Sequence, residues 1–220
     1  MAVTKRGEER RQTILQRTIT IMADRGIEST RLQDVAKAAG ISIGTIQHYF
    51  ASREELIDTA LSTYTLQTVD RIWSAVPEDE PDDWLALISL LHSYRSSGDM
   101  KERARIWISL SNSAMTNTHH RTLLESLYFQ WSRPFLRVLR RGTRSGRFHP
   151  ILPVEACTDV LLRLTDGYAM AEATTTGEAL ALGHDLSDLP AVVGMPADAD
   201  LTERVLVRLS AALVGIDQSA

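Results

Sequence analysis

Hydrophobic residues recur along most of the chain at intervals of three and four positions, and no stretch alternates apolar with polar residues. The first spacing is typical of one face of an α-helix, and the absence of alternation argues against β-strands. No internal repeat is visible either. The pattern therefore predicts an all-α protein.

The segment from Thr30 to Phe50 is the most informative, because two short apolar runs meet there across a glycine. Ala36 is small where a larger side chain would push two packed helices apart, and Gly40 can adopt the positive φ that ends a helix. Two short helices joined by this turn would bury Leu32, Val35, Ala39, Ile41, Ile46 and Tyr49. The pattern predicts a helix-turn-helix, in which the second helix, from Ile43 to about Tyr49, enters the DNA major groove.

Polar residues mark the starts of both helices. We expect Thr30 to cap the first helix, with Asp34 in its first turn, and Ser42 to cap the second. The two helix starts are thus predicted independently of the apolar pattern.

These residues and their neighbours resemble the N-terminal DNA-binding domain of the TetR family of transcriptional regulators. The resemblance covers about the first quarter of the chain, and several short blocks carry it in order. They are RRQTIL (Arg10–Leu15), ADRGIEST (Ala23–Thr30), DVAKAAGISIGTIQHYF (Asp34–Phe50) and SREELIDTAL (Ser52–Leu61). The resemblance implies a three-helix DNA-binding domain over residues 1–53 and a helical ligand-binding and dimerisation domain over residues 54–220.

The family resemblance also implies a function. We expect a homodimeric DNA-binding transcriptional regulator, a repressor released from a palindromic operator by an unidentified small-molecule effector. It would have no catalytic residues, no metal and no cofactor. The alternative is a helical small-molecule carrier or enzyme that lacks specific DNA binding.

The expected DNA-binding surface lies around the second helix of the motif. Gln47 can bond an adenine edge, His48 can reach a base acceptor or a phosphate, and the Thr45 hydroxyl suits a phosphate. Many relatives have Tyr where this chain has Gln47, so the operator sequence is not predicted. The expected contact residues are Thr30, Arg31, Ser42, Ile43, Gly44, Thr45, Gln47, His48, Tyr49 and Arg53, with Arg53 assigned to a phosphate. A plain polar helix face is the alternative interpretation.

Beyond Glu54 the apolar spacing predicts further helices to the end of the chain. Pro134 lies inside one of them, which would either kink there or break and restart. The resemblance implies that the last two helices pair with their symmetry mates, and we expect Leu161 in that dimer interface. The stretch from Leu180 to Met195 is too apolar for a simple linker and is left unplaced.

Aromatic residues with a few polar neighbours in this second region can line a ligand pocket. The candidate ligand-binding residues are Trp73, His92, Arg105, Trp107, Tyr128, Trp131 and Tyr168. Taken singly, each aromatic residue is better explained as part of a hydrophobic core, and the assignment to a ligand pocket follows from the family resemblance.

Composition and charge fit this interpretation. The 220 residues carry a net charge of −4, but residues 1–56 hold nine Lys or Arg against seven Asp or Glu, and the remainder holds 15 against 21. A mildly basic start on an acidic remainder suits a protein that touches phosphates with one part only. The first residues form no signal peptide, and no run of about 20 apolar residues predicts a membrane span, so we expect a cytoplasmic protein. The single cysteine, Cys157, is expected to be a packed core residue.

Other chemistry is less well supported. The string GISIG at Gly40–Gly44 matches a hydrolase nucleophile motif, but a predicted helix precedes it where that motif needs a strand. The adjacent His119 and His120 cannot both face one side of a helix, so no metal site is expected. A basic stripe of Arg133, Arg137, Arg140, Arg144 and Arg147 is interpreted as a solvated face or as intersubunit ion pairs, with an anion site or a second nucleic-acid surface as alternatives.

Overall fold

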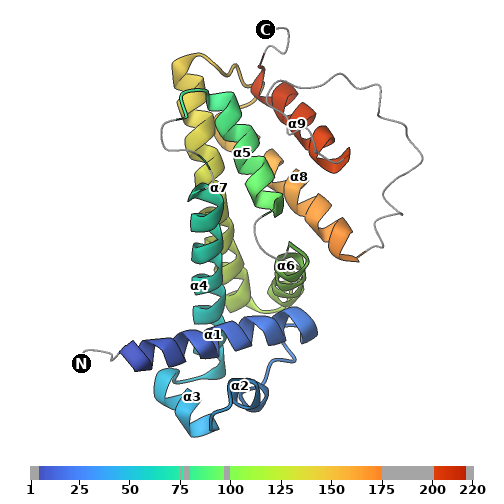
Figure 1. Ribbon diagram of the computed structural model, residues 1–220. Helices are drawn as coiled ribbons and strands as arrows, with labels where there is room; N and C mark the ends of the chain where they lie inside the picture. Colours follow the sequence, from blue (N-terminus) through green and yellow to red (C-terminus); the bar gives the residue numbers. More distant parts are fainter. Residues whose placement is uncertain (1–4, 75, 77–79, 97–99, 175–200, 217–220) are drawn as a thin grey trace. The chain divides into compact units, whose positions relative to one another are not determined.

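The computed structural model describes residues 5–74, 76, 80–96, 100–174 and 201–216. These residues form α-helices and no strand, which confirms the predicted all-α fold (Figure 1). None of these helices is long and apolar enough to span a membrane. They are α1 (Lys5–Arg25), α2 (Leu32–Ala39), α3 (Ile43–Tyr49), α4 (Arg53–Ser74), α5 (Asp83–Ser96), α6 (Met100–Ala114), α7 (Thr118–Ser145), α8 (Val154–Thr174) and α9 (Leu201–Val214).

The chain divides into two compact units. Unit 1 comprises residues 1–67 and 102–128, and unit 2 comprises residues 68–101 and 129–220. The division falls within α4 and α7 and also near the start of α6, so each of these helices contributes to both units. The predicted domain boundary after residue 53 stays a prediction.

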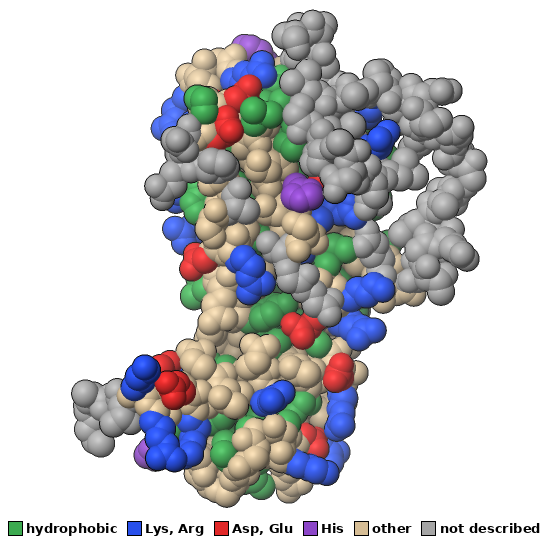
Figure 2. All heavy atoms as spheres, in the orientation of Figure 1, with side chains coloured by type: hydrophobic (Ala, Val, Ile, Leu, Met, Phe, Trp, Pro, Cys, Tyr) green, Lys and Arg blue, Asp and Glu red, His purple; other side chains and the backbone are tan. Residues whose placement is uncertain are grey.

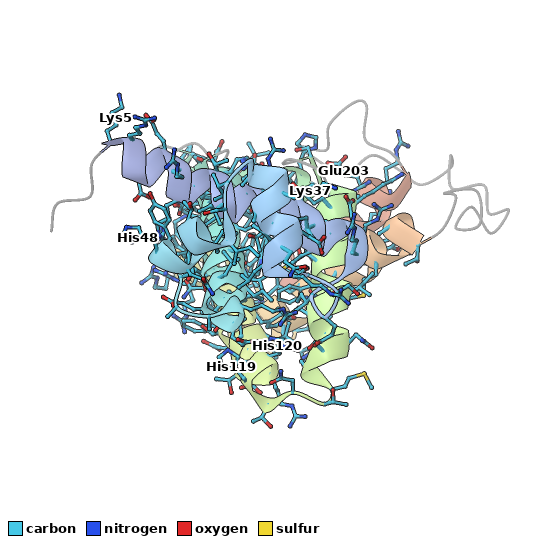
Figure 3. All side chains as sticks on the ribbon, turned by 90° about the horizontal axis from the view of Figure 1, so that it is seen from below. Lys5, Lys37, His48, His119, His120 and Glu203 are labelled. Atoms are coloured by element: carbon cyan, nitrogen blue, oxygen red, sulfur yellow. The ribbon has the colours of Figure 1, made fainter. Side chains whose placement is uncertain are left out.

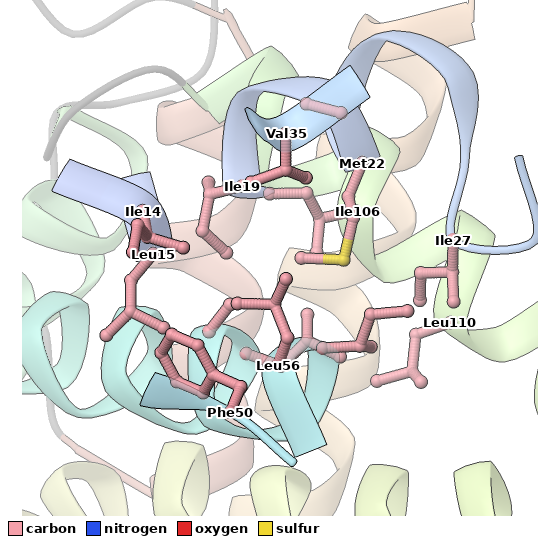
Figure 4. Packing of buried hydrophobic residues seen from close by; sticks show 14 of the residues in the cluster. Ile14, Leu15, Ile19, Met22, Ile27, Val35, Phe50, Leu56, Ile106 and Leu110 are labelled. Carbon is pink, nitrogen blue, oxygen red and sulfur yellow. The ribbon is translucent and has the colours of Figure 1, made fainter. Parts of the chain in front are cut away.

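Unit 1 is built around a continuous apolar core. Side chains of α1 and the start of α4 meet there with Val35 of α2, Ile46 of α3 and Ile106 of α6 (Figure 4). Spacings of three and four residues along α1 place Ile14, Leu15, Ile19 and Met22 on its buried side. α1 therefore packs against α2, which packs in turn against α3, and Ile46 of α3 joins the same core.

The turn between α2 and α3 has the geometry predicted for it. Gly40 ends α2 with φ 65° and ψ 34°, the left-handed conformation that glycine adopts without a steric penalty. Ser42 caps α3, because its Oγ accepts a hydrogen bond of 3.1 Å from the Thr45 backbone N–H. Both predictions are confirmed, and the GISIG string is this interhelical turn.

The predicted cap of α2 is wrong. Arg31 occupies the N-cap position and makes no side-chain cap hydrogen bond. The Thr30 hydroxyl donates instead to the carbonyl oxygen of Gly26 at 2.9 Å, and Thr30 is only 1% exposed. This hydrogen bond therefore links the end of the α1–α2 loop to its beginning.

Unit 2 has a second core, in which α9 lies against both α8 and α5. Tyr94 of α5 packs edge-on against Trp131 and Phe135 of α7, with ring centroids 5.3 and 6.1 Å away. Its hydroxyl donates a 2.5 Å hydrogen bond to Asp166 of α8. Cys157 is fully buried, as predicted, and burial raises the pKa of its thiol.

The predicted basic stripe is largely engaged within unit 2. Arg137 stacks over the ring of Trp73 at 4.5 Å from its centroid, Arg140 pairs with Glu155 at 2.8 Å, and Arg147 pairs with Asp82 at 3.3 Å. Such contacts favour a structural role for the stripe over a second nucleic-acid surface.

Two further expectations are resolved in unit 2. α7 continues through Pro134 as one helix from Thr118 to Ser145, so it does not break there. Leu161 is 1% exposed and belongs to the core of unit 2, so the prediction that it lies in a dimer interface is wrong. The segment from Leu180 to Met195 lies outside the described residues.

Candidate nucleic-acid interface

The seven residues of α3 divide cleanly into an inner and an outer side. Ile46 is fully buried in the core of unit 1, and Tyr49 is half-buried. Ile43, Gly44, Gln47 and His48 are exposed. One turn of helix separates the first two from the last two, so these four residues form one continuous outer face.

His48 projects from this face. It points away from the core in the view onto α2 and α3 (Figure 3). Its ring packs edge-on against Tyr49, with centroids 5.3 Å apart, which limits the orientations open to the imidazole. Gln47 and His48 are thus both exposed on this face, and their assignment as DNA contacts stays a prediction.

Ser42 and Thr45 stabilise the start of α3. Their hydroxyl oxygens lie 2.9 Å apart in a hydrogen bond, in addition to the cap that Thr45 N–H donates to Ser42. These hydroxyls are therefore already engaged in setting the local backbone of the helix. A phosphate contact by either side chain stays a prediction.

At the start of α2, the two predicted DNA contacts, Thr30 and Arg31, differ in the exposure of their side chains. Arg31 is exposed and can meet a phosphate with its side chain, whereas the buried hydroxyl of Thr30 cannot do so without opening the loop. Their assignment as DNA contacts is otherwise untested.

Arg53 makes contacts that the sequence did not predict. Its Nε donates to the carbonyl oxygen of Thr30 at 2.7 Å, and its Nη2 donates to the carbonyl oxygen of Ile27 at 2.5 Å. The side chain is 26% exposed, and its Nη1 lies 3.5 Å from Glu54. Arg53 ties the start of α4 to the α1–α2 loop, and its predicted phosphate contact stays a prediction.

The same loop is held from α6. Ile27 N–H donates to Ser109 Oγ at 2.7 Å, and Ser113 Oγ donates to a carboxylate oxygen of Glu28. Ser113 Oγ also lies 2.5 Å from Nδ1 of His120 at the start of α7. His120 is 3% exposed, so this network is closed to solvent at one end. The loop that precedes the helix-turn-helix is thus fixed from α4, α6 and α7.

No sequence signal pointed to this network, since its partners are about 80 residues apart in the chain. The neighbouring His119 has a different partner, with its Nε2 2.6 Å from Asp58 of α4. The adjacent histidines therefore serve separate contacts. Among the described residues no three His, Cys, Asp or Glu side chains come together as a metal site.

Unit 1 carries exposed basic side chains on α1 and α2. Lys5 at the start of α1 and Lys37 on α2 are both exposed, and Arg11 lies over the Phe50 ring at 5.4 Å from its centroid. Figure 2 shows Lys and Arg side chains toward both ends of α1, with a few acidic residues among them. Such a setting lowers the electrostatic cost of bringing phosphates close.

Comparison with known proteins favours a transcriptional regulator over a helical carrier or enzyme. The family model described as "Bacterial regulatory proteins, tetR family" matches residues 14–60, which include the whole of α2 and α3. Residues 14–60 of the chain thus match the DNA-binding region of the TetR family.

Proteins that are similar to this chain include transcriptional regulators. The uncharacterised HTH-type regulator YfiR of Bacillus subtilis is 26% identical over 168 residues, which is 75% of this chain and 81% of YfiR. The repressor KstR2 of Mycolicibacterium smegmatis is 38% identical over 55 residues, 25% of this chain and 27% of that protein. A crystal structure of a TetR-family regulator from Rhodococcus sp. has the same fold, with a TM-score of 0.73, 19% identity, and coverage of 94% of this chain and 99% of that one.

The predicted ligand-binding residues do not form one cluster. Arg105, Trp107 and Tyr128 belong to unit 1, where the rings of Trp107 and Tyr128 stack with centroids 6.2 Å apart. The others belong to unit 2 and have separate contacts: Trp73 with Arg137, His92 with Glu203 at 2.7 Å, and Trp131 with Tyr94. Tyr168, also in unit 2, is half-buried on α8. Their role in ligand binding stays a prediction.

Proposed function

We propose that this protein is a TetR-family homodimeric repressor whose two α3 helices read the half-sites of a palindromic operator and which a small-molecule effector releases. The observation that carries the proposal is the outer face of α3, where Gln47 and His48 are exposed while Ile46 anchors the helix in the core. A short helix held in this way is suited to the major groove.

Within the interface the residues have different roles. Gln47 bonds an adenine edge through N6 and N7, and His48 reaches a base acceptor or a phosphate. The exposed Arg31 contacts phosphates, which fixes the register but carries no sequence information. Ile43 and Gly44 bring the start of α3 against the groove, and Ser42, Thr45 and Tyr49 hold its conformation.

Dimerisation through α8 and α9 is supported by apolar residues that unit 2 leaves incompletely buried. Val160, Leu164 and Ala171 lie on one side of α8 together with Gly167, at the spacing of a helix stripe. A Cβ placed on Gly167 would meet nothing within 4 Å, so a second helix can approach closely there. On α9, Leu209 is 43% exposed. We assign these faces to a two-fold interface with a second copy of the chain.

An isologous dimer of this kind requires a symmetric operator. The two α3 helices should contact half-sites separated by about one turn of B-DNA, roughly 34–36 Å, or by a modestly larger span. Effector binding can release DNA only if the effector binds more tightly to a dimer conformation in which the distance between the two α3 helices does not fit the operator. α4 and α7 are suited to transmit that change, because each runs through both units.

TetR-family regulators bind DNA and small-molecule ligands. We assign effector binding to the helical region beyond residue 53, and we assign no catalytic chemistry and no cofactor to the chain. A DNA-binding role also places it in the cytoplasm with the chromosome. The effector can be sought by thermal shift against a metabolite library, since a ligand that binds only the native state raises its melting temperature.

The rival class is a helical carrier or enzyme, which would bind DNA only as a generic polyanion. Selection of the purified protein against a randomised duplex pool separates the two. We expect enrichment of an inverted repeat with half-sites about one helical turn apart or slightly more. A pool that stays random after repeated rounds would reject the repressor.

A further inference from the structure

Gly44 is a glycine that the fold of unit 1 does not require. It lies in the first turn of α3, and its φ is outside the left-handed region in which glycine is favoured. A Cβ built on it would meet only the Ser42 hydroxyl at 3.8 Å, an ordinary van der Waals distance. Any small side chain would therefore fit the isolated protein at this position.

Three other glycines, by contrast, have a clear structural reason. A Cβ on Gly142 would lie 2.2 Å from the Phe148 ring, and a Cβ on Gly215 would lie 2.1 Å from the His149 carbonyl oxygen. Gly40 needs its positive φ to end α2. Gly44 has neither a steric nor a conformational requirement of this kind, although glycine is among the poorest helix formers.

The position of Gly44 on α3 supplies the missing reason. Successive residues of a helix are rotated by 100°, so residue 44 lies between residues 47 and 48 on the outer face. Gly44 is thus at the centre of the face that Gln47 and His48 flank, and all three are exposed. A side chain there would be the first atom group of α3 to meet a surface approaching this face.

We propose that Gly44 sets the depth at which α3 enters the major groove. Without a Cβ, the α3 backbone makes direct contact with the DNA at this point, and this close approach allows the side chains of Gln47 and His48 to reach the base edges. Gly44 is therefore a specificity-determining residue that acts by its small size. The inference rests on the proposed function, since it requires DNA to occupy this face.

The test uses the full-length protein and two duplexes of equal length: one recovered from a randomised pool by the wild-type protein, and a scrambled version of it. Gly44→Ala and Gly44→Leu are compared with wild type. Ser126→Leu, a bulky change at an exposed site on α7 of unit 1, is the matched control. Melting temperatures of all variants are measured in parallel.

We expect Gly44→Ala to melt no lower than wild type, because alanine is the better helix former. Affinity for the recovered duplex should fall in the order wild type, Ala, Leu, with a loss of about tenfold or more for Leu. Affinity for the scrambled duplex should not change, since phosphate contacts dominate it. Ser126→Leu should behave as wild type on both duplexes.

Equal affinity of wild type and Gly44→Leu for the recovered duplex would overturn the inference, and so would an equal loss on both duplexes. Gly44→Ala keeps the test decisive if Gly44→Leu melts early, because alanine adds one methyl group to a helix that tolerates it. If the wild-type protein recovers no duplex from the pool, the proposed function fails and this inference fails with it.

Discussion

The guanidinium of Arg53 donates a hydrogen bond from Nε to the main-chain carbonyl oxygen of Thr30 at 2.7 Å. Its Nη2 donates in the same way to Ile27, so one side chain at the start of α4 satisfies two carbonyl groups of the α1–α2 loop. This loop leads directly into α2, the first helix of the helix-turn-helix. The orientation of the DNA-reading helices is thereby linked to the start of α4.

Replacing Arg53 tests this link. Arg53→Ala should destabilise the protein by about 1–3 kcal/mol, the usual range when hydrogen bonds to a charged group are lost. DNA affinity should fall while the slope of log affinity against log salt stays unchanged. Arg53→Lys, which keeps the charge but not the paired N–H groups, should also be destabilised. A slope reduced by about one in Arg53→Ala would instead establish the phosphate contact that the sequence predicted.

Ser109 provides a second test of how the loop is held. Ser109→Ala removes the acceptor for the Ile27 N–H, which then loses its partner in a part-buried site. We expect a loss of about 1–3 kcal/mol in the free energy of unfolding, measured by urea denaturation. Ser111→Ala, a half-buried serine on the same helix, serves as the control and should change stability little. Equal effects of the two changes would remove Ser109 from the network.

Substitutions at two leucines of α8 distinguish the proposed dimer interface from the core of unit 2. Leu164→Asp should yield monomers in light scattering with helix content retained, because Leu164 is only half-buried within its own unit. Leu161→Asp should instead cause unfolding, since a carboxylate would be forced into the core. A folded dimer of Leu164→Asp would move the interface to another surface.

Asp82 is expected to anchor the start of α5. Its carboxylate accepts a hydrogen bond from Trp84 N–H at 2.8 Å and pairs with Arg147. Burial tends to raise the pKa of this carboxyl, but the hydrogen bonds from Trp84 and Arg147 outweigh it, and the pKa is lowered below 3.8. Since the folded state favours the ionised form, this contribution is present above the unfolded pKa and is lost as the pH falls through the folded value.

Asp82→Ala should therefore cost about 1 kcal/mol at neutral pH, the typical value of an N-cap residue. The difference in unfolding free energy between wild type and variant should shrink below about pH 4. A difference that stays constant from neutral to acid pH would show that the charge of Asp82 does not matter.

The sequence predicted the local structure of unit 1 well because that structure depends on short-range rules. Gly40 and Ser42 are specified by the turn conformation and by the cap they provide, and both can be identified from the residues within one helical turn. Thr30 shows the limit of such rules. A threonine before a helix is often an N-cap, but the Thr30 hydroxyl donates instead to the Gly26 carbonyl oxygen within the same loop.

Contacts between residues far apart in the chain could not be predicted from the pattern of apolar and polar residues. Arg53 bonds carbonyl groups more than 20 positions away, and Ser113 reaches Glu28 across 85 positions. Apolar periodicity identifies a helix face but not its partner, which is why Leu161 was assigned to a dimer interface and lies in the core. The predicted ligand-binding residues fell into both units for the same reason.

The most direct test of the whole account is specific DNA binding by Gln47 and His48. Fluorescence anisotropy with a duplex recovered by selection should compare wild type with the Gln47→Ala, His48→Ala double variant at physiological salt. We predict a loss of about 100-fold or more on the selected duplex, since each base contact is worth roughly 1–3 kcal/mol, with little change on a scrambled duplex. An unchanged affinity for the selected duplex in a folded double variant would contradict the claim that the outer face of α3 reads DNA.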